Sequence, residues 1–195
     1  MINRGISNFF VLATFVVVAL TAPADCRAQA RDHFTPQEVE LIQDAQILDK
    51  RMDVFIRAID RRILAMTGVT DSSAKQLKKE SEKWGELPTG TRAELIADIG
   101  RILNEAITNI DDVNSRDDKN PLIPKALRKL AAAATQTVER LRPLQAQSKD
   151  DAETMGFEQL VKHADEIVSA AGALPPPAEK KSKDKNKTEK PKETN

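Results

Sequence analysis

The residues of this sequence that could do chemistry are few, and their spacing fits no common reaction centre. Histidine, the usual general base and metal ligand, occurs only as His33 and His163. Leu160 stands three residues before His163, where a di-iron helical protein needs the glutamate of a Glu-x-x-His pair. A zinc site built from two histidines and no cysteine lacks its usual ligand set. The sequence therefore predicts no metal and no cofactor.

One stretch, DDVNSRDDKNPLI, has the spacing of acidic ligands found at the start of a calcium-binding loop. Asp112 and Asn114 match the first and third positions of such a loop. Arg116 stands at the fifth position, Asp117 where a glycine is required, and Ile123 at the twelfth, where a glutamate is required. We interpret this stretch as a surface turn.

Nucleophilic and phosphate chemistry have no motif here either. The sequence contains no G-x-S-x-G, no glycine loop that could cradle a phosphate and no H-E-x-x-H. A serine nucleophile also needs a nearby base, and histidine is scarce. We therefore expect a protein that is not an enzyme, without catalytic residues.

Two groups of residues remain as candidates for interaction. Arg57, Arg61 and Arg62 form a cationic cluster, although Asp53 and Asp60 could neutralise it in an intramolecular charge network. We expect the aliphatic part of Arg62 to lie along the core and its guanidinium to reach water.

Asn109 and Thr137 are polar residues at positions of the helical repeat that face the core. They could hydrogen-bond to each other across the interior, or they could line a polar pocket for a small ligand.

The elements that must position these residues are all helical. Thr35 with Glu38 has the spacing of a capping box, and no glycine interrupts the chain before Gly68, so we expect one helix of about 31 residues. Thr91 with Glu94 opens a second long helix that runs to about residue 115. A third helix is expected at about 121–147, and Pro143 should kink or end it. A fourth is expected at about 151–172. A short helix should follow a cap at residue 71 or 72.

Each of the four long helices carries a wide apolar stripe at heptad positions a, d and e. A wide stripe suits a helix that packs against two neighbours. We therefore expect an all-α domain over residues 31–173, an antiparallel four-helix bundle with one extra short helix. An obligate or swapped dimer remains an alternative use of the same stripes.

The first thirty residues have the three parts of a secretory signal peptide. Arg4 supplies the positive charge, residues 9–20 form an apolar run, and Ala28 and Ala30 frame a small-x-small cleavage site before Arg31. An earlier cut near residues 22–24 and a retained anchor remain open, although the apolar run is shorter than the ~20 residues of a membrane span.

The far end of the chain differs in composition from the rest. Residues 174–195 contain seven lysines against four acidic residues and, after Leu174, no apolar side chain larger than alanine or proline, so we expect a disordered tail. The body is close to neutral and has few aromatic rings, which argues against binding of nucleic acid.

Together these features predict an exported protein, periplasmic or extracellular, with a binding or structural role in the cell envelope. We expect an envelope protein as a possible partner, a monomer or homodimer, and no stable membrane span after cleavage. The alternative is a helical bundle that binds a small ligand in a polar interior pocket.

Overall fold

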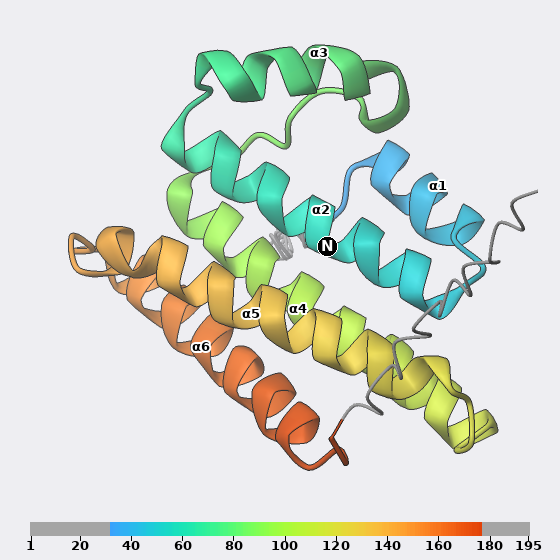
Figure 1. Ribbon diagram of the computed structural model, residues 1–195. Coiled ribbons are helices and arrows are strands. Elements are labelled where there is room, and N and C mark those ends of the chain that lie inside the picture. The colour runs from blue at the N-terminus through green and yellow to red at the C-terminus, as the bar shows by residue number, and fades with distance from the viewer. Residues whose placement is uncertain (1–31, 177–195) are drawn as a thin grey trace, which may run out of the picture. The chain divides into compact units, whose positions relative to one another are not determined.

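A computed structural model of the chain describes residues 32–176, which contain helices and connecting turns but no strand. The helices are α1 (Pro36–Asp44), α2 (Leu48–Thr67), α3 (Asp71–Trp84), α4 (Arg92–Arg116), α5 (Leu122–Gln145) and α6 (Asp151–Gly172) (Figure 1). The expectation of an all-α fold is confirmed for this part of the chain. The expected signal peptide, its cleavage residues Ala28, Ala30 and Arg31, and residues 177–195 of the expected tail lie outside the described residues.

The prediction of a single long helix from Thr35 is wrong, because the helix is interrupted between Asp44 and Leu48. The capping box at the start of α1 is present: the Glu38 N–H donates to Thr35 Oγ1 at 3.3 Å, and the Thr35 N–H donates to Glu38 Oε2 at 3.0 Å. The helix then ends at Ala45, whose ψ of 77° is not helical. Arg51 Nε binds the Ala45 carbonyl at 3.0 Å, so the first turns of α2 stabilise the end of α1.

The reason for the break lies far along the chain. Glu38 and Arg61 form an ion pair at 3.1 Å although 23 residues separate them. In one straight helix these residues would stand about 35 Å apart. The chain can make this ion pair only if α1 folds back beside α2.

Several other helix ends lie where the sequence predicts them. Thr91 and Glu94 form the capping box of α4, and Asp150 caps α6 by accepting from the Ala152 N–H at 2.9 Å. Gly68 ends α2 with φ of 88°, a value that glycine adopts easily.

Two boundaries differ from the expectation. The cap of α3 is Thr70 rather than Asp71 or Ser72, and it forms a capping box with Ser73. Pro143 lies inside α5 and does not end it. Proline lacks the N–H that would bond one turn back, and at this position only the last turn of α5 remains to be disturbed.

The hydrophobic core lies between α2, α4, α5 and α6. Helices α4 and α5 each contact the other three, whereas α1 contacts only α2 and α3. The apolar stripes supply most of the core, which includes Met52, Phe55, Ile59, Ile99, Ile102, Leu103, Leu130, Ala134, Phe157, Leu160 and Ile167.

Helices α4 and α6 run in the same direction. Gly156 of α6 meets Ile96 of α4, and Leu160, one turn later in α6, meets Gly100, one turn later in α4. Arg92 also pairs with Glu153, so the two helices begin side by side.

Helices α2 and α5 are parallel as well. Asp49 near the start of α2 binds Lys125 near the start of α5 at 2.9 Å, and Asp60 pairs with Arg140 further along both helices. These two parallel pairs depart from an arrangement in which all neighbouring helices are antiparallel.

The glycines between α4 and α6 generate a prediction about packing. A Cβ on Gly100 would lie 3.6 Å from the backbone of Leu160, which is ordinary contact, whereas one on Gly156 would lie 3.1 Å from Ile96 Cγ2. In the interior of a helix, alanine is more favourable than glycine by about 1 kcal/mol. We expect Gly100→Ala to raise the free energy of unfolding by up to about 1 kcal/mol. Gly156→Ala should raise the free energy of unfolding by less, or lower it. Urea unfolding measures both variants, and an equal increase in the two would contradict the packing described.

The pKa of Asp49 supplies a prediction about acid stability. Lys129, whose Nζ lies 2.7 Å from Oδ1, and then Lys125 hold this pKa below its ordinary value, against the opposing effect of burial. A group with a lowered pKa in the folded chain stabilises the fold above its unfolded pKa, and that contribution is lost as the pH falls through the folded pKa.

We therefore expect Asp49→Asn to be less stable than the wild type near neutral pH, and the difference to shrink below about pH 4. Urea unfolding at a series of pH values measures it. The exposed Asp111 of α4 provides the control: Asp111→Asn should keep the wild-type pH profile. A difference for Asp49→Asn that stays constant down to low pH would refute the assignment.

Candidate interaction surface

A buried ionic cluster lies where α1 meets α2. Glu38 is fully buried, and Arg61 and Arg62 are each 1% exposed. Glu38 Oε1 accepts from Arg61 Nε at 3.1 Å and from Arg62 Nη1 at 3.0 Å, while Oε2 accepts from Arg62 Nη2 at 2.7 Å. The expectation that the Arg62 guanidinium reaches water is therefore wrong, because Glu38 supplies its charge partner inside the protein.

Arg61 extends the cluster to the end of α3. Its Nη2 donates to the Trp84 carbonyl at 3.0 Å and also to the carbonyl of Glu86. Its guanidinium lies over the Trp84 ring, with Cζ 5.6 Å from the ring centroid, the geometry of a cation–π contact. One side chain of α2 thus holds both the last residue of α3 and the turn that follows it.

Arg62 extends the cluster in the other direction, to the segment before α1. Its Nη2 donates to the His33 carbonyl, its Nη1 to the Ala58 carbonyl at 2.7 Å, and its Cζ lies 5.9 Å from the centroid of the Phe34 ring. Phe34 in turn packs on Phe55 of the core. The residues just before α1 are therefore attached to the folded domain.

The pKa of Arg61 lies below its ordinary value. Burial is the largest cause, the nearby Arg62 and Arg57 act in the same direction, and the contacts with Glu38 oppose them. Two guanidinium groups share one carboxylate, so the cluster carries a surplus positive charge. Backbone carbonyl oxygens around both arginines offset that surplus.

Arg57, the third arginine of the predicted cluster, holds the inner side of α3. Its Nε donates to Glu80 Oε2 at 3.0 Å, and Gln76 Nε2 donates to Glu80 Oε1 at the same distance. Burial acts to raise the pKa of Glu80, but the hydrogen bonds from Gln76 and Arg57 outweigh it, so the pKa lies below its usual range. The three arginines therefore bind within the domain and do not form an exposed cationic patch.

Helix α3 itself takes no part in the hydrophobic core. None of its described residues belongs to the core cluster or packs against it. Its backbone lies closest to α1, and its contacts with α2 are made by the side chains of Arg57 and Arg61. Trp84 at its end is buried, but under Arg61. Ionic and polar contacts thus hold this helix on the domain.

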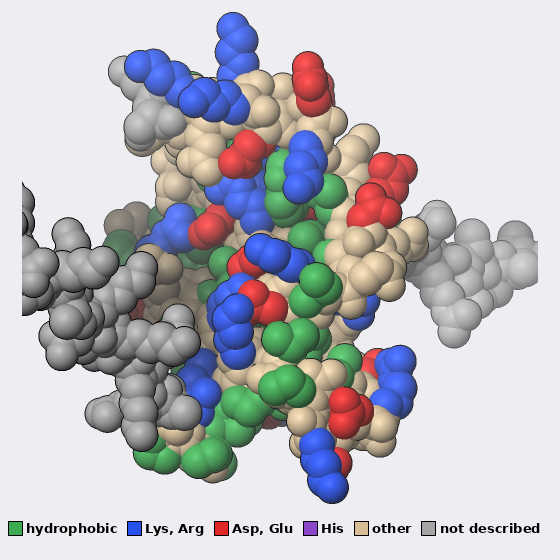
Figure 2. Space-filling view, turned by 45° about the vertical axis from the view of Figure 1, so that its right-hand side comes forward, with side chains coloured by type: hydrophobic (Ala, Val, Ile, Leu, Met, Phe, Trp, Pro, Cys, Tyr) green, Lys and Arg blue, Asp and Glu red, His purple; other side chains and the backbone are tan. Residues whose placement is uncertain are grey.

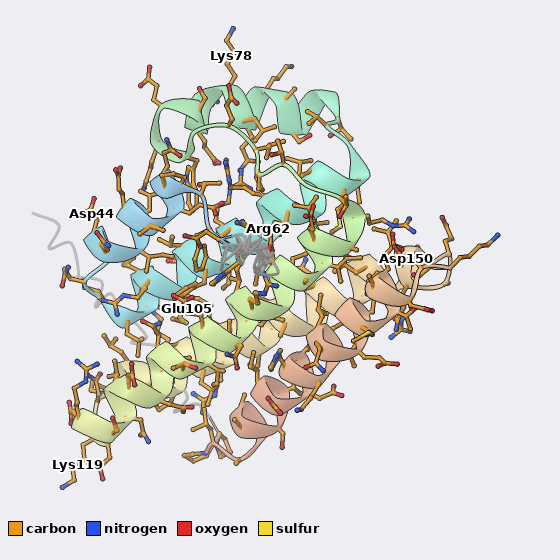
Figure 3. The ribbon with its side chains drawn as sticks, turned by 180° about the vertical axis from the view of Figure 1, so that it is seen from behind. Asp44, Arg62, Lys78, Glu105, Lys119 and Asp150 are labelled. Atoms are coloured by element: carbon orange, nitrogen blue, oxygen red, sulfur yellow. The ribbon has the colours of Figure 1, made fainter. Side chains whose placement is uncertain are left out.

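The side of α3 opposite these contacts carries lysines. Lys75, Lys78 and Lys79, which we call the lysine face, are all exposed. Figure 2 shows basic side chains projecting at the top, where α3 lies, and Figure 3 shows Lys78 directed away from the other helices. None of the three forms an ion pair with a described side chain.

Asn109 and Thr137 are the other two candidate residues from the sequence. Asn109 is half-buried, accepts from Arg51 Nη1 at 3.1 Å and donates to the Glu105 carbonyl at 3.1 Å. Thr137 is 4% exposed within α5. The structure joins Asn109 to the end of α1 through Arg51, a link that sequence spacing did not reveal.

A shallow apolar hollow of about 410 Å³ lies between α4 and α6. Its lining includes Ala97, Gly100, Ala152, Gly156 and Met155, the last of which is 66% exposed. The interior glycines of both helices are the sequence signal that could have indicated it, because they let the helices approach closely.

Both histidines lie at an adjoining hollow on the same side. His33 Nε2 is 2.8 Å from Glu105 Oε2, and His163 Nδ1 is 3.4 Å from Glu166 Oε2. Within residues 32–176, no group of three or more potential ligands from His, Cys, Asp and Glu is placed to hold a metal ion. In the same range, no helix is both long and apolar enough for a membrane span.

Comparison of the chain with protein-family models, with curated proteins and with solved structures finds no match. Its function has to be inferred from its own side chains.

The buried cluster gives a prediction about stability. Glu38→Gln keeps the size of the side chain but leaves two arginines without their counter-charge, so we expect a loss of about 3–5 kcal/mol in the free energy of unfolding. Glu40→Gln, on the exposed side of α1, is the matched control and should change it by less than about 0.5 kcal/mol. Urea unfolding measures both. Equal, small effects would show that Glu38 does not neutralise the arginines.

Proposed function

We propose that this chain is an exported, non-enzymatic helical protein with a binding role in the cell envelope, and that α3 presents its contact surface. The observation that carries the proposal is the position of α3. The described residues of α3 lie outside the core cluster, and Arg57 and the buried Arg61 attach the helix, so the domain displays it on its surface. A displayed helix with one charged side suits recognition better than support of the core.

The proposed export depends on the leader sequence. A positive residue, an apolar run and the site at Ala28 and Ala30 fit removal of residues 1–30. Cleavage there would leave Arg31 as the first residue, three positions before the buried Phe34.

We also infer that α2, α4, α5 and α6 close into a four-helix bundle. The contacts follow the cyclic order α2, α4, α6, α5, in which each helix touches two neighbours and α4 also touches α5 across the centre. The short connection between α5 and α6 favours an antiparallel pair there, while α2 with α5 and α4 with α6 are parallel.

A second candidate function is binding of a small apolar ligand. The hollow between α4 and α6, with the exposed Met155 beside it, favours this candidate. The pair Asn109 and Thr137 does not, since Arg51 and the Glu105 carbonyl already bind the Asn109 amide.

Photo-cross-linking from defined positions tests the proposed function. A photoreactive side chain at Lys78 should give adducts with an envelope component in the exported fraction, because this position lies on the displayed side of α3. The matched position is Lys119, an exposed lysine between α4 and α5, far from Lys78 in Figure 3, where few adducts are expected. Adducts that are absent at Lys78, or equally frequent at both positions, would contradict a binding role for α3.

A further inference from the structure

We infer that the lysine face of α3 binds the surface of an anionic lipid membrane. This inference deepens the proposed function and rests on it. Lys78 and Lys79 follow Lys75 by three and four residues, so the three side chains lie together on one side of the helix. Lys83 follows one turn after Lys79 but lines a hollow with Asp44 and Asp53, so the outward row consists of Lys75, Lys78 and Lys79.

The acidic residues of α3 leave this row positive. Glu80 lies on the inner side of the helix, where Arg57 and Gln76 bind its carboxylate. Glu82 shares the outer side with the lysines and is the remaining acid of the helix whose side chain is described. The lysines thus outnumber the acidic side chains described on the side that faces away from the domain.

The attachment of α3 fixes the direction in which the lysines point. Arg57 binds the middle of the helix, and Arg61 binds the backbone carbonyls at its end. With two separate anchors, the helix cannot easily turn its lysines back toward the acidic groups of the domain. The charges are therefore presented together to an external surface, and little conformational entropy is lost on contact.

The type of cation favours a lipid surface over nucleic acid. Lysine is a compact point charge without the planar fork by which arginine recognises single phosphates, and it suits attraction to a diffuse surface potential. Binding of single-stranded nucleic acid also needs exposed rings for stacking. The only ring on α3, Trp84, is buried and covered by Arg61.

Such contact would be peripheral and sensitive to salt. The potential of an anionic membrane falls within a screening length of about 8–10 Å, so only lysines directly at the surface contribute. Each lysine there contributes a factor of roughly five to the partition coefficient. Three lysines give reversible binding and not permanent anchorage.

Sedimentation with lipid vesicles tests the inference. The chain from residue 31 onward is mixed with vesicles of equal parts phosphatidylglycerol and phosphatidylcholine, or of phosphatidylcholine alone. We expect binding to the first and not to the second, and weaker binding as salt is added. The triple variant Lys75→Gln, Lys78→Gln and Lys79→Gln should lower the partition coefficient on the order of a hundredfold.

The matched control removes three exposed lysines that lie outside α3, in Lys119→Gln, Lys149→Gln and Lys162→Gln. It has the same net charge as the α3 variant and should bind almost as the wild type does. Equal losses in both variants, or no binding to anionic vesicles, would overturn the inference. If vesicles are not bound while Lys78 still cross-links to an envelope protein, the lipid inference fails and the proposed function stands; if neither occurs, both fail.

Discussion

The structure depends on one carboxylate, that of Glu38, neutralising two guanidinium groups away from water. An ion buried without a partner is costly by several kcal/mol, and here the charges do not balance one to one. The surplus positive charge is met by the carbonyl oxygens of His33 before α1, of Trp84 at the end of α3 and of Glu86 just after it. A single electrostatic requirement therefore brings two separate stretches of chain, the start of α1 and the end of α3, to the surface of α2.

Two kinds of cohesion follow, in different parts of the domain. Helices α2, α4, α5 and α6 adhere through buried aliphatic and aromatic side chains, with close approach of α4 and α6 at Gly100 and Gly156. Helix α3 adheres through charged and polar contacts to α2, whereas α1 combines such contacts with the packing of Val39 and Ile42 against the core. Hydrophobic contact is roughly indifferent to direction, whereas the ionic contacts need particular atoms in particular places, and they fix how the two outer helices lie.

The apolar periodicity of the sequence was sufficient to predict the core, since residues such as Ile59, Ile99 and Leu160 are buried as their positions in the repeat indicate. It did not reveal the relative direction of the helices, because a helix has the same apolar stripe whether its neighbour is parallel or antiparallel. Only residue pairs such as Gly100 with Leu160 show that α4 and α6 are parallel.

The candidate site was harder to predict. Glu38 already had a local explanation as part of a capping box, and its second role depends on residues more than twenty positions away. The break after Asp44 carries no glycine or proline, so nothing local marks it. The periodicity predicted that the stem of Arg62 lies along the core and that its guanidinium reaches water, and it gave no reason to bury Arg61. The burial of both guanidinium groups depends on tertiary contacts that spacing does not show.

The attachment of α3 by the side chain of Arg61 to backbone carbonyls has an evolutionary consequence. Carbonyl oxygens are present whatever the residue type, so the hydrogen bonds from Arg61 to the end of α3 do not require particular side chains there. The outward residues of the helix can change without disturbing the packing of the domain. Recognition and foldedness can then be selected separately, and descendants of such a chain could acquire new specificities on an unchanged scaffold.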